Sequence, residues 1–319
     1  MPVDDFPRFG ETPAMWITAR IATALAALLL ASCSGQSRLK ADLSKVRPWT
    51  TDLERAEPLP APYVVDFEAG SKALTFLAVE HSNEASSPSL RLVESVMDAR
   101  RYAAVVLEGI PRSYGVNPAG FLSRAEKDGG SGFFREGERS IAVRMAARKA
   151  VPFVGGEPDE DLVKANVLAA GFTVDDLFFF YLLRQVPLWR RDGTLTRGGF
   201  EEAYLEYAPE FGKRLGYKDG EEPKLEAFHR WYQARIGRPF RLRDVSNETV
   251  APFAAGELFS QRISAVTTRV RDEHIVRVVE EMLNRYGRVL MVYGSSHFTM
   301  QKLALESMLG APRRISDQP

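Results

Sequence analysis

Cysteine and histidine are scarce in this chain of 319 residues, which contains one Cys and four His. A single cysteine excludes an intramolecular disulfide framework and a zinc site made of four cysteines. An excess of charge of one sign is also lacking, because 42 Lys and Arg balance 42 Asp and Glu. A balanced chain has no strong overall field to attract nucleic acid, so we expect no nucleic-acid partner.

Long apolar runs are almost absent. The run at 177–183 is flanked by charged residues on both sides and is typical of a buried helix. The exception is 21–30, which is apolar or small throughout, follows Arg20 and precedes the sequence Leu-Ala-Ser-Cys. A positive flank, a short apolar stretch and small residues at a cleavage point predict a secretory signal peptide over residues 1–33.

The signal sequence ends on Cys33, the only cysteine. Its ending resembles the bacterial lipobox, which implies lipidation of Cys33 and a membrane-anchored protein of the cell envelope, facing the periplasm or the exterior. A plain signal peptide with an incidental cysteine is the alternative. Ser34 in place of Asp favours the outer membrane over the inner one. Three acidic residues precede Met15, and we expect translation to start at Met15 rather than at Met1.

The rest of the chain divides into a polar segment and one large domain. Residues 34–62 are polar and end in three prolines within five residues, which predicts a tether. Residues 63–319 predict an α/β domain with a central, mostly parallel sheet flanked by helices, because short apolar runs alternate with helix-period patterns. Helical periods rich in aromatic residues over about 159–255 predict a helical insertion before the last strand.

Four short apolar runs each lead to a residue that can bind a metal or move a proton. The runs are 74–79, 103–107, 151–154 and 289–293, and the residues are His81, Glu108, Glu157 and His297. In an open parallel sheet, ligands and chemistry gather beyond the carboxyl ends of the strands. We therefore expect these four side chains to meet in one crevice.

The strongest of these endings is Gly294-Ser295-Ser296-His297. A glycine directly after a strand permits a tight turn, and the His then lies at the start of the next helix. Ala78-Val79-Glu80-His81 is a weaker copy, with Ala in the place of Gly. Either His could be a structural residue at a strand end, but both occupy strand exits in a chain that has only four.

The acidic and basic candidates have ordinary alternatives. Glu108 could cap a helix or pair with a surface Arg, and Glu157 could stabilise a helix N-terminus. Arg271 and Asp272 lie on the long helix predicted over 258–286, where charged residues are mostly solvated. In the functional interpretation, Arg271 stabilises an oxyanion and Asp272 orients a His.

These residues together resemble the Tiki/TraB/ChaN superfamily, which also takes in erythromycin-esterase-like proteins. The resemblance rests on the two His motifs, a strand-end Glu after the first and an Arg shortly before the second, and it covers most of 72–309 in motif order. It implies one shared site of His81, Glu108, Arg271 and His297. Members include metal-dependent proteases, esterase-like hydrolases and haem-binding surface lipoproteins. This chain departs from the pattern at Ala78 and at Phe298.

The leading hypothesis is a divalent-metal-dependent hydrolase of amide or ester bonds in a small-molecule or peptide substrate. His81, Glu108 and His297 would bind Mn, Co or Zn, since imidazole and carboxylate suit these ions. Glu157 or Glu108 would serve as general base, with Arg271 facing the developing negative charge. In a metal-free version, one of the two His is the base.

Two other hypotheses remain open. A haem-binding lipoprotein of iron uptake needs an axial His or Tyr and an apolar pocket, which the aromatic insertion could supply. Packing is the favoured interpretation of those aromatics, and they are Phe178, Phe179, Phe180, Tyr181, Trp189, Trp231 and Tyr232. The third hypothesis is a non-catalytic module that binds a component of the envelope.

Overall fold

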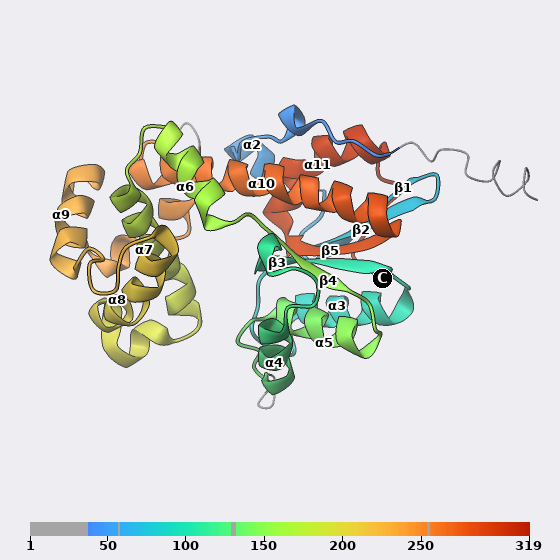
Figure 1. The fold of residues 1–319 in the computed structure, drawn as a ribbon, viewed down its shortest axis with the longest axis horizontal. Helices are drawn as coiled ribbons and strands as arrows, with labels where there is room; N and C mark the ends of the chain where they lie inside the picture. The colour runs from blue at the N-terminus through green and yellow to red at the C-terminus, as the bar shows by residue number, and fades with distance from the viewer. Residues whose placement is uncertain (1–37, 57, 129–131, 254–255) are drawn as a thin grey trace, which may run out of the picture. The chain divides into compact units, whose positions relative to one another are not determined.

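In the part of the chain that the structure describes, six strands form one sheet with the order β4-β3-β5-β2-β1-β6 (Figure 1). The computed structural model describes residues 38–56, 58–128, 132–253 and 256–319, so the predicted signal peptide and Cys33 lie outside the described residues. The strands are β1 (Tyr63–Ala69), β2 (Lys72–Val79), β3 (Ala104–Pro111), β4 (Phe153–Glu157), β5 (Arg288–Gly294) and β6 (Arg314–Ser316). The predicted α/β class with a mostly parallel sheet is confirmed.

The central strands β2, β3, β4 and β5 run parallel, and β1 pairs with β2 in the antiparallel sense. Strand β1 is second from the edge, because β6 near the end of the chain pairs with its outer side. A three-residue strand carries too little pattern to be predicted from sequence.

Helices cover both faces of the sheet (Figure 1). One face packs against α3 (Pro88–Ala99), α4 (Ala119–Lys127) and α5 (Glu138–Arg148), and the other against α10 (Phe259–Tyr286) and α11 (Ser295–Leu309). Successive residues of β2 serve opposite cores: Phe76 belongs to one and Leu77 to the other. This is why the predicted strands are continuous apolar runs rather than alternating ones.

Helix α3 illustrates how the local sequence starts these helices. The hydroxyl of Ser87 accepts a hydrogen bond from the backbone N–H of Leu90, and Pro88 occupies the first turn. Both features favour a helix N-terminus at the carboxyl end of β2. Leu92, Val93 and Val96 then recur on one face and are buried against the sheet.

A third core lies outside the sheet, within the predicted insertion. It is built by α6 (Glu160–Ala169), α7 (Val174–Arg191), α8 (Thr194–Leu215) and α9 (Leu225–Ile236), together with the first half of α10. The seven aromatic residues named above are buried in it, and their rings pack against one another and against neighbouring rings. Packing, the favoured interpretation, is confirmed.

No single helix in the described ranges is long and apolar enough to cross a bilayer. The consecutive helices α6 and α7, which are bent by 118° relative to each other, reach that length and apolar composition only as a pair.

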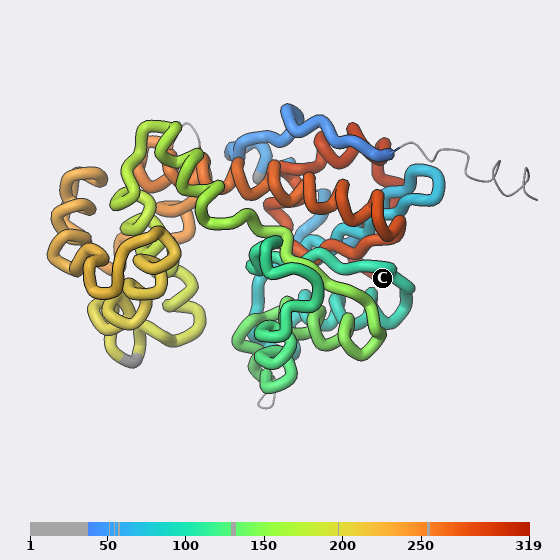
Figure 2. The backbone as a smooth tube through the Cα atoms, in the orientation of Figure 1, coloured from blue at the N-terminus to red at the C-terminus, as the bar shows by residue number. Residues whose placement is uncertain are grey.

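The described part of the expected tether packs on the domain instead of hanging free. It runs along α10 and α11 through η1 (Leu43–Lys45) and α2 (Thr51–Glu54) (Figure 2). Backbone N–H groups of Leu39 and Ala41 donate to side chains of α10. We call residues 39–56 the strap. Its few apolar residues are too widely spaced to predict burial from sequence, yet Ala41 belongs to the core under the sheet.

Candidate active site at the carboxyl ends of the strands

The four predicted strand endings converge. His81 follows β2, Glu108 and Glu157 lie at the ends of β3 and β4, and His297 lies in the first turn of α11, directly after β5. These strands are parallel neighbours, so their carboxyl ends share one edge of the sheet.

The carboxylate of Glu108 lies at the centre of this group. Its Oε1 is 3.4 Å from Nε2 of His297 and 3.3 Å from a guanidinium nitrogen of Arg271. Its Oε2 is 3.6 Å from Nε2 of His81 and accepts a hydrogen bond of 2.8 Å from the backbone N–H of Gly294. Glu108 therefore lies between the two imidazoles, with one oxygen toward each.

Each imidazole is held from behind by a second carboxylate. Nδ1 of His297 lies 2.6 Å from Oδ1 of Asp272, as the sequence analysis expected, and Nδ1 of His81 lies 2.5 Å from Oε1 of Glu138. A carboxylate at Nδ1 orients the ring and directs Nε2 outward. Both Nε2 atoms thus face Glu108.

The two His differ in exposure and in electrostatics. The side chain of His297 is 7% exposed, and although burial lowers its pKa, the charges of Asp272 and Glu108 outweigh burial and raise the pKa to about 10. The side chain of His81 is 41% exposed. Burial lowers its pKa too, but Glu108 and Glu138 more than compensate, so the pKa is raised from its usual value of 6.5. His297 is therefore a buried imidazolium at neutral pH. His81 is the more exposed of the two imidazoles.

Glu108 remains ionised although it is partly buried. Burial acts to raise the pKa of this carboxyl, but the neighbouring charges of His81, His297 and Arg271 hold it well below its usual range. The centre thus contains a negative charge flanked by the protonated His297 and by Arg271.

Glu157 and Arg271 form a two-pronged ion pair. The guanidinium donates to both carboxylate oxygens of Glu157, at 2.7 and 2.9 Å, and Oε1 also accepts from the backbone N–H of Gly109 at 3.1 Å. Burial raises the pKa of Glu157, but Arg271 prevails and lowers it. Both oxygens accept hydrogen bonds, so Glu157 is the counter-ion that fixes Arg271. Its expected role as general base stays a prediction.

Arg271 and Asp272 reach the site because α10 serves two cores in succession. Its earlier residues, such as Ile263, pack in the core of the insertion, and its later residues, such as Ile275, pack under the sheet. The two charged residues lie where the apolar face changes from one core to the other. Asp272 is fully buried there, and its Oδ1 also accepts from Gln301 at 2.6 Å.

Gly294 allows the close approach of the central groups. A Cβ atom on this residue would lie 3.1 Å from Nε2 of His81 and 3.6 Å from Oε2 of Glu108. The backbone of Gly294 has an ordinary negative φ of −54°, so the reason for glycine here is space rather than conformation. The glycine in the strongest motif of the sequence thus leaves room for the imidazole of the weaker motif.

The placement of the donors does not match the expected metal site. Among the described residues, no group of three or more His, Cys, Asp or Glu side chains is arranged to hold a metal ion. Glu108 separates His81 from His297 instead of sharing a common point with them. The guanidinium of Arg271 against the same carboxylate would also repel a divalent cation. The binding of Mn, Co or Zn stays a prediction.

Sequence reasoning missed two polar partners, Glu138 and Gln301. Glu138 begins α5, where a carboxylate is ordinary as a partner of the helix dipole, and nothing in the local pattern links it to His81 57 residues earlier. Gln301 lies four residues after His297 and therefore on the same helical face. That spacing was the one available signal.

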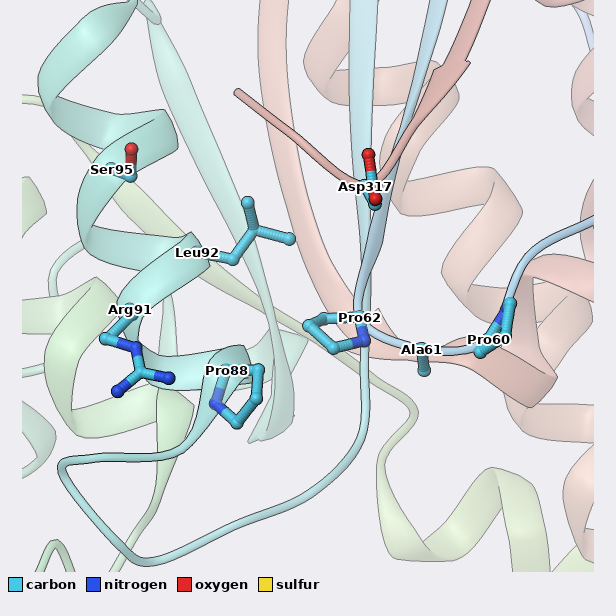
Figure 3. A pocket seen from close by; sticks show the side chains of 8 residues that line it. All are labelled: Pro60, Ala61, Pro62, Pro88, Arg91, Leu92, Ser95 and Asp317. Carbon is cyan, nitrogen blue, oxygen red and sulfur yellow. The ribbon is translucent and has the colours of Figure 1, made fainter.

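Hollows elsewhere on the surface are distinct from this site. One of about 410 Å³ lies between Pro60–Pro62 and the start of α3, and its lining contains Arg91 and Asp317 but no imidazole (Figure 3). Another of about 600 Å³ lies between Trp49 and the start of α10. Neither hollow is lined by His81, Glu108 or His297.

Comparison of the chain with models of protein families, with curated proteins and with solved structures found no match.

Proposed function

We propose that this protein is a hydrolase of ester or amide bonds in which His81 is the general base. The observation that carries the proposal is the arrangement of two imidazoles, each held at Nδ1 by a carboxylate, with both Nε2 atoms directed at Glu108. The membership in the Tiki/TraB/ChaN superfamily and the lipid anchor at Cys33 suggested by the sequence are part of the same proposal.

His81 is the group best placed to take a proton from water. Its Nε2 lies 3.6 Å from Oε2 of Glu108, beyond hydrogen-bonding distance, and its side chain is 41% exposed. Nε2 therefore keeps its capacity to bind a water molecule, while Glu138 at Nδ1 stabilises the imidazolium that forms. A base held in this way contributes roughly 10²- to 10⁴-fold to the rate.

The negative charge that develops on the attacked carbonyl oxygen needs cations nearby. His297, protonated at neutral pH, and Arg271, fixed by Glu157, supply two of them beside Glu108. Because they are held by buried carboxylates before the reaction begins, they need little reorganisation as charge develops. The leaving group receives the proton that His81 has taken from water.

The test is hydrolysis of a panel of 4-nitrophenyl esters and peptide 4-nitroanilides by the purified protein from Cys33 onward. His81→Gln should lower kcat/KM at least 100-fold, because glutamine cannot take up a proton. His229→Gln is the matched control, since His229 is an exposed residue of α9 with only ring contacts to Phe228 and Phe240. Hydrolysis that survives in His81→Gln, or no hydrolysis of any substrate, would overturn the proposal.

A chelator separates the metal-free mechanism from the metal-dependent one. We expect EDTA treatment to leave the rate within twofold of the untreated rate, and mass spectrometry to find no stoichiometric Mn, Co or Zn. A stoichiometric metal that disappears in both His81→Ala and His297→Ala would replace the mechanism above with the metal-dependent one.

A further inference from the structure

Arg184 of α7 lies near the candidate site and has no ion-pair partner among the described residues. It is partly buried, and it makes no hydrogen bond or ion pair with any residue in the described ranges. Most other partly buried arginines nearby are engaged: Arg271 binds Glu157, and Arg139 donates to the carbonyl oxygens of Glu108 and Gly109. A desolvated charge with no counter-ion is costly.

The fold places Arg184 within electrostatic range of Arg271, Glu157 and Glu108. Three residues earlier on the same helical face, the hydroxyl of Tyr181 donates to Glu160 at 2.5 Å. Glu160 begins α6, only three residues after Glu157. This contact therefore holds the Arg184 face of α7 near the end of β4.

The electrostatics agree with that placement. Burial, followed by repulsion from Arg271, lowers the pKa of Arg184 to about 10, while Tyr181, Glu157 and Glu108 act in the opposite direction. Arg184 thus remains protonated at neutral pH and feels the charges of the site. A further anion beside these two guanidinium groups would reduce their mutual repulsion.

Arg191, seven residues along α7, extends the same face. Two helical turns separate the two residues, so they share one side of the helix. The charge of Arg191 acts on His81 and lowers its pKa, which places this side chain within electrostatic range of the general base. The neighbouring Arg190 differs, because it donates to the backbone carbonyls of Leu242 and Val245.

We propose that Arg184, assisted by Arg191, binds an anionic group of the substrate, a carboxylate or a phosphate, next to the bond that the water activated by His81 attacks. The inference rests on the proposed function and adds the substrate class to it. A guanidinium presents two parallel N–H donors to such an oxyanion and so fixes its orientation. The helical insertion would then select the substrate through Arg184 and Arg191, and the residues at the carboxyl ends of the strands would catalyse hydrolysis.

Anion binding provides a test that does not depend on turnover. Isothermal titration calorimetry with succinate and with inorganic phosphate distinguishes the two anions. Arg184→Gln should weaken the binding of whichever anion the wild type binds by roughly 10- to 100-fold, and Arg184→Lys should weaken it less. Arg230→Gln, an exposed arginine of α9, is the control and should bind as the wild type does. If the wild type binds neither anion, or Arg184→Gln binds as the wild type does, the inference is wrong.

Hydrolysis of a charged and a neutral ester separates this inference from the proposed function. The pair is mono-4-nitrophenyl succinate and 4-nitrophenyl butyrate, and Arg184→Gln should reduce kcat/KM for the charged ester only. Hydrolysis with no preference between them would overturn the anion site and leave the hydrolase standing. Anion binding that depends on Arg184, without hydrolysis of either ester, would support the anion site and refute the hydrolase.

Discussion

Asp272 is the most deeply buried charge of the site, and its Oδ1 contacts both His297 and Gln301. Asp272→Asn keeps the shape but removes the negative charge that stabilises the imidazolium. We expect the variant to lose roughly 3 kcal/mol of unfolding free energy, because it leaves a buried cation without its partner. Urea unfolding at pH 7 measures this loss.

Asp161→Asn is the matched control for that substitution. The side chain of Asp161 is 91% exposed and pairs only with Lys164 on the surface of α6. We expect its unfolding free energy to stay within about 0.5 kcal/mol of the wild type. An Asp272→Asn protein as stable as this control would mean that His297 is neutral in the folded state.

The pH dependence of stability follows from His297. Its pKa is about 10 in the folded protein against an ordinary 6.5, so the folded state holds the proton more tightly. The resulting stability is fully present below pH 6.5 and is lost as the pH rises through about 10, by at most about 1.4 kcal/mol per pH unit. Urea unfolding from pH 6 to pH 10.5 should show this decline in the wild type and a flatter curve in His297→Gln. Parallel curves would refute the raised pKa.

At the scale of elements, Gly155 within β4 and Gly294 at the end of β5 serve different purposes. A Cβ on Gly155 in β4 would lie 1.9 Å from the carbonyl oxygen of Ile110 in β3, and strand backbones cannot yield easily. Gly155→Ala should therefore destabilise the protein by about 1–3 kcal/mol. At Gly294, between β5 and α11, the new methyl group would meet mainly the imidazole of His81, which is partly exposed and able to shift.

Gly294→Ala should therefore act on activity more than on stability. We expect less than about 1 kcal/mol of destabilisation, because the backbone conformation suits alanine. Displacement of His81 should lower kcat roughly 10- to 100-fold on the best ester of the panel. Thermal unfolding and steady-state kinetics of the two alanine variants, measured side by side, check both expectations. Equal effects of the two variants on kcat at equal stability would contradict this division.

At the scale of the whole molecule, the strap ties the N-terminal part of the domain to its last helices. Asn284 of α10 accepts from the backbone N–H of Leu39 at 2.8 Å and donates to its carbonyl oxygen at 2.9 Å. Asn284→Ala should release residues 39–46 from α10 and cost about 1–3 kcal/mol, since backbone groups lose their partners. Limited proteolysis should then cut within 39–46 faster than in the wild type.

Asn166→Ala is the control for the strap, because Asn166 is exposed on α6 and bonds only a carbonyl of its own helix. Its cleavage pattern should match that of the wild type. If Asn284→Ala is also cut as the wild type is, the strap is held by its apolar contacts, such as Ala41, and not by this pair of hydrogen bonds.

The path of the strap marks the point where sequence reasoning was weakest. Residues 34–62 look like a solvated tether because few of them are apolar, but Val46 and Leu53 are buried in the folded domain. Burial of such a segment depends on contacts with α10 and α11, which the residue pattern of the segment itself does not predict. The outer strand β6 was missed for the same reason, because its partner β1 lies about 250 residues earlier.

Residue patterns along the chain were enough to predict the parallel strands and the residues that follow them. Apolar runs of strand length, punctuated by glycine and by helix starts, place His81, Glu108, Glu157 and His297 at strand exits, and parallel topology brings those exits to one edge. The sequence also marked the last glycine motif and the Arg271–Asp272 pair.

The pairing of these charged groups depends on the packing of elements that lie far apart in the sequence. In the folded protein Glu108 lies between the two imidazoles, and Glu157 pairs with Arg271. Glu138 of helix α5 contacts His81. Periodicity reports which face of an element is buried, because burial is a property of each residue along its own helix or strand. Pairing of polar groups is a property of two distant residues, and it is settled only when packing of the cores brings their atoms within a few ångströms.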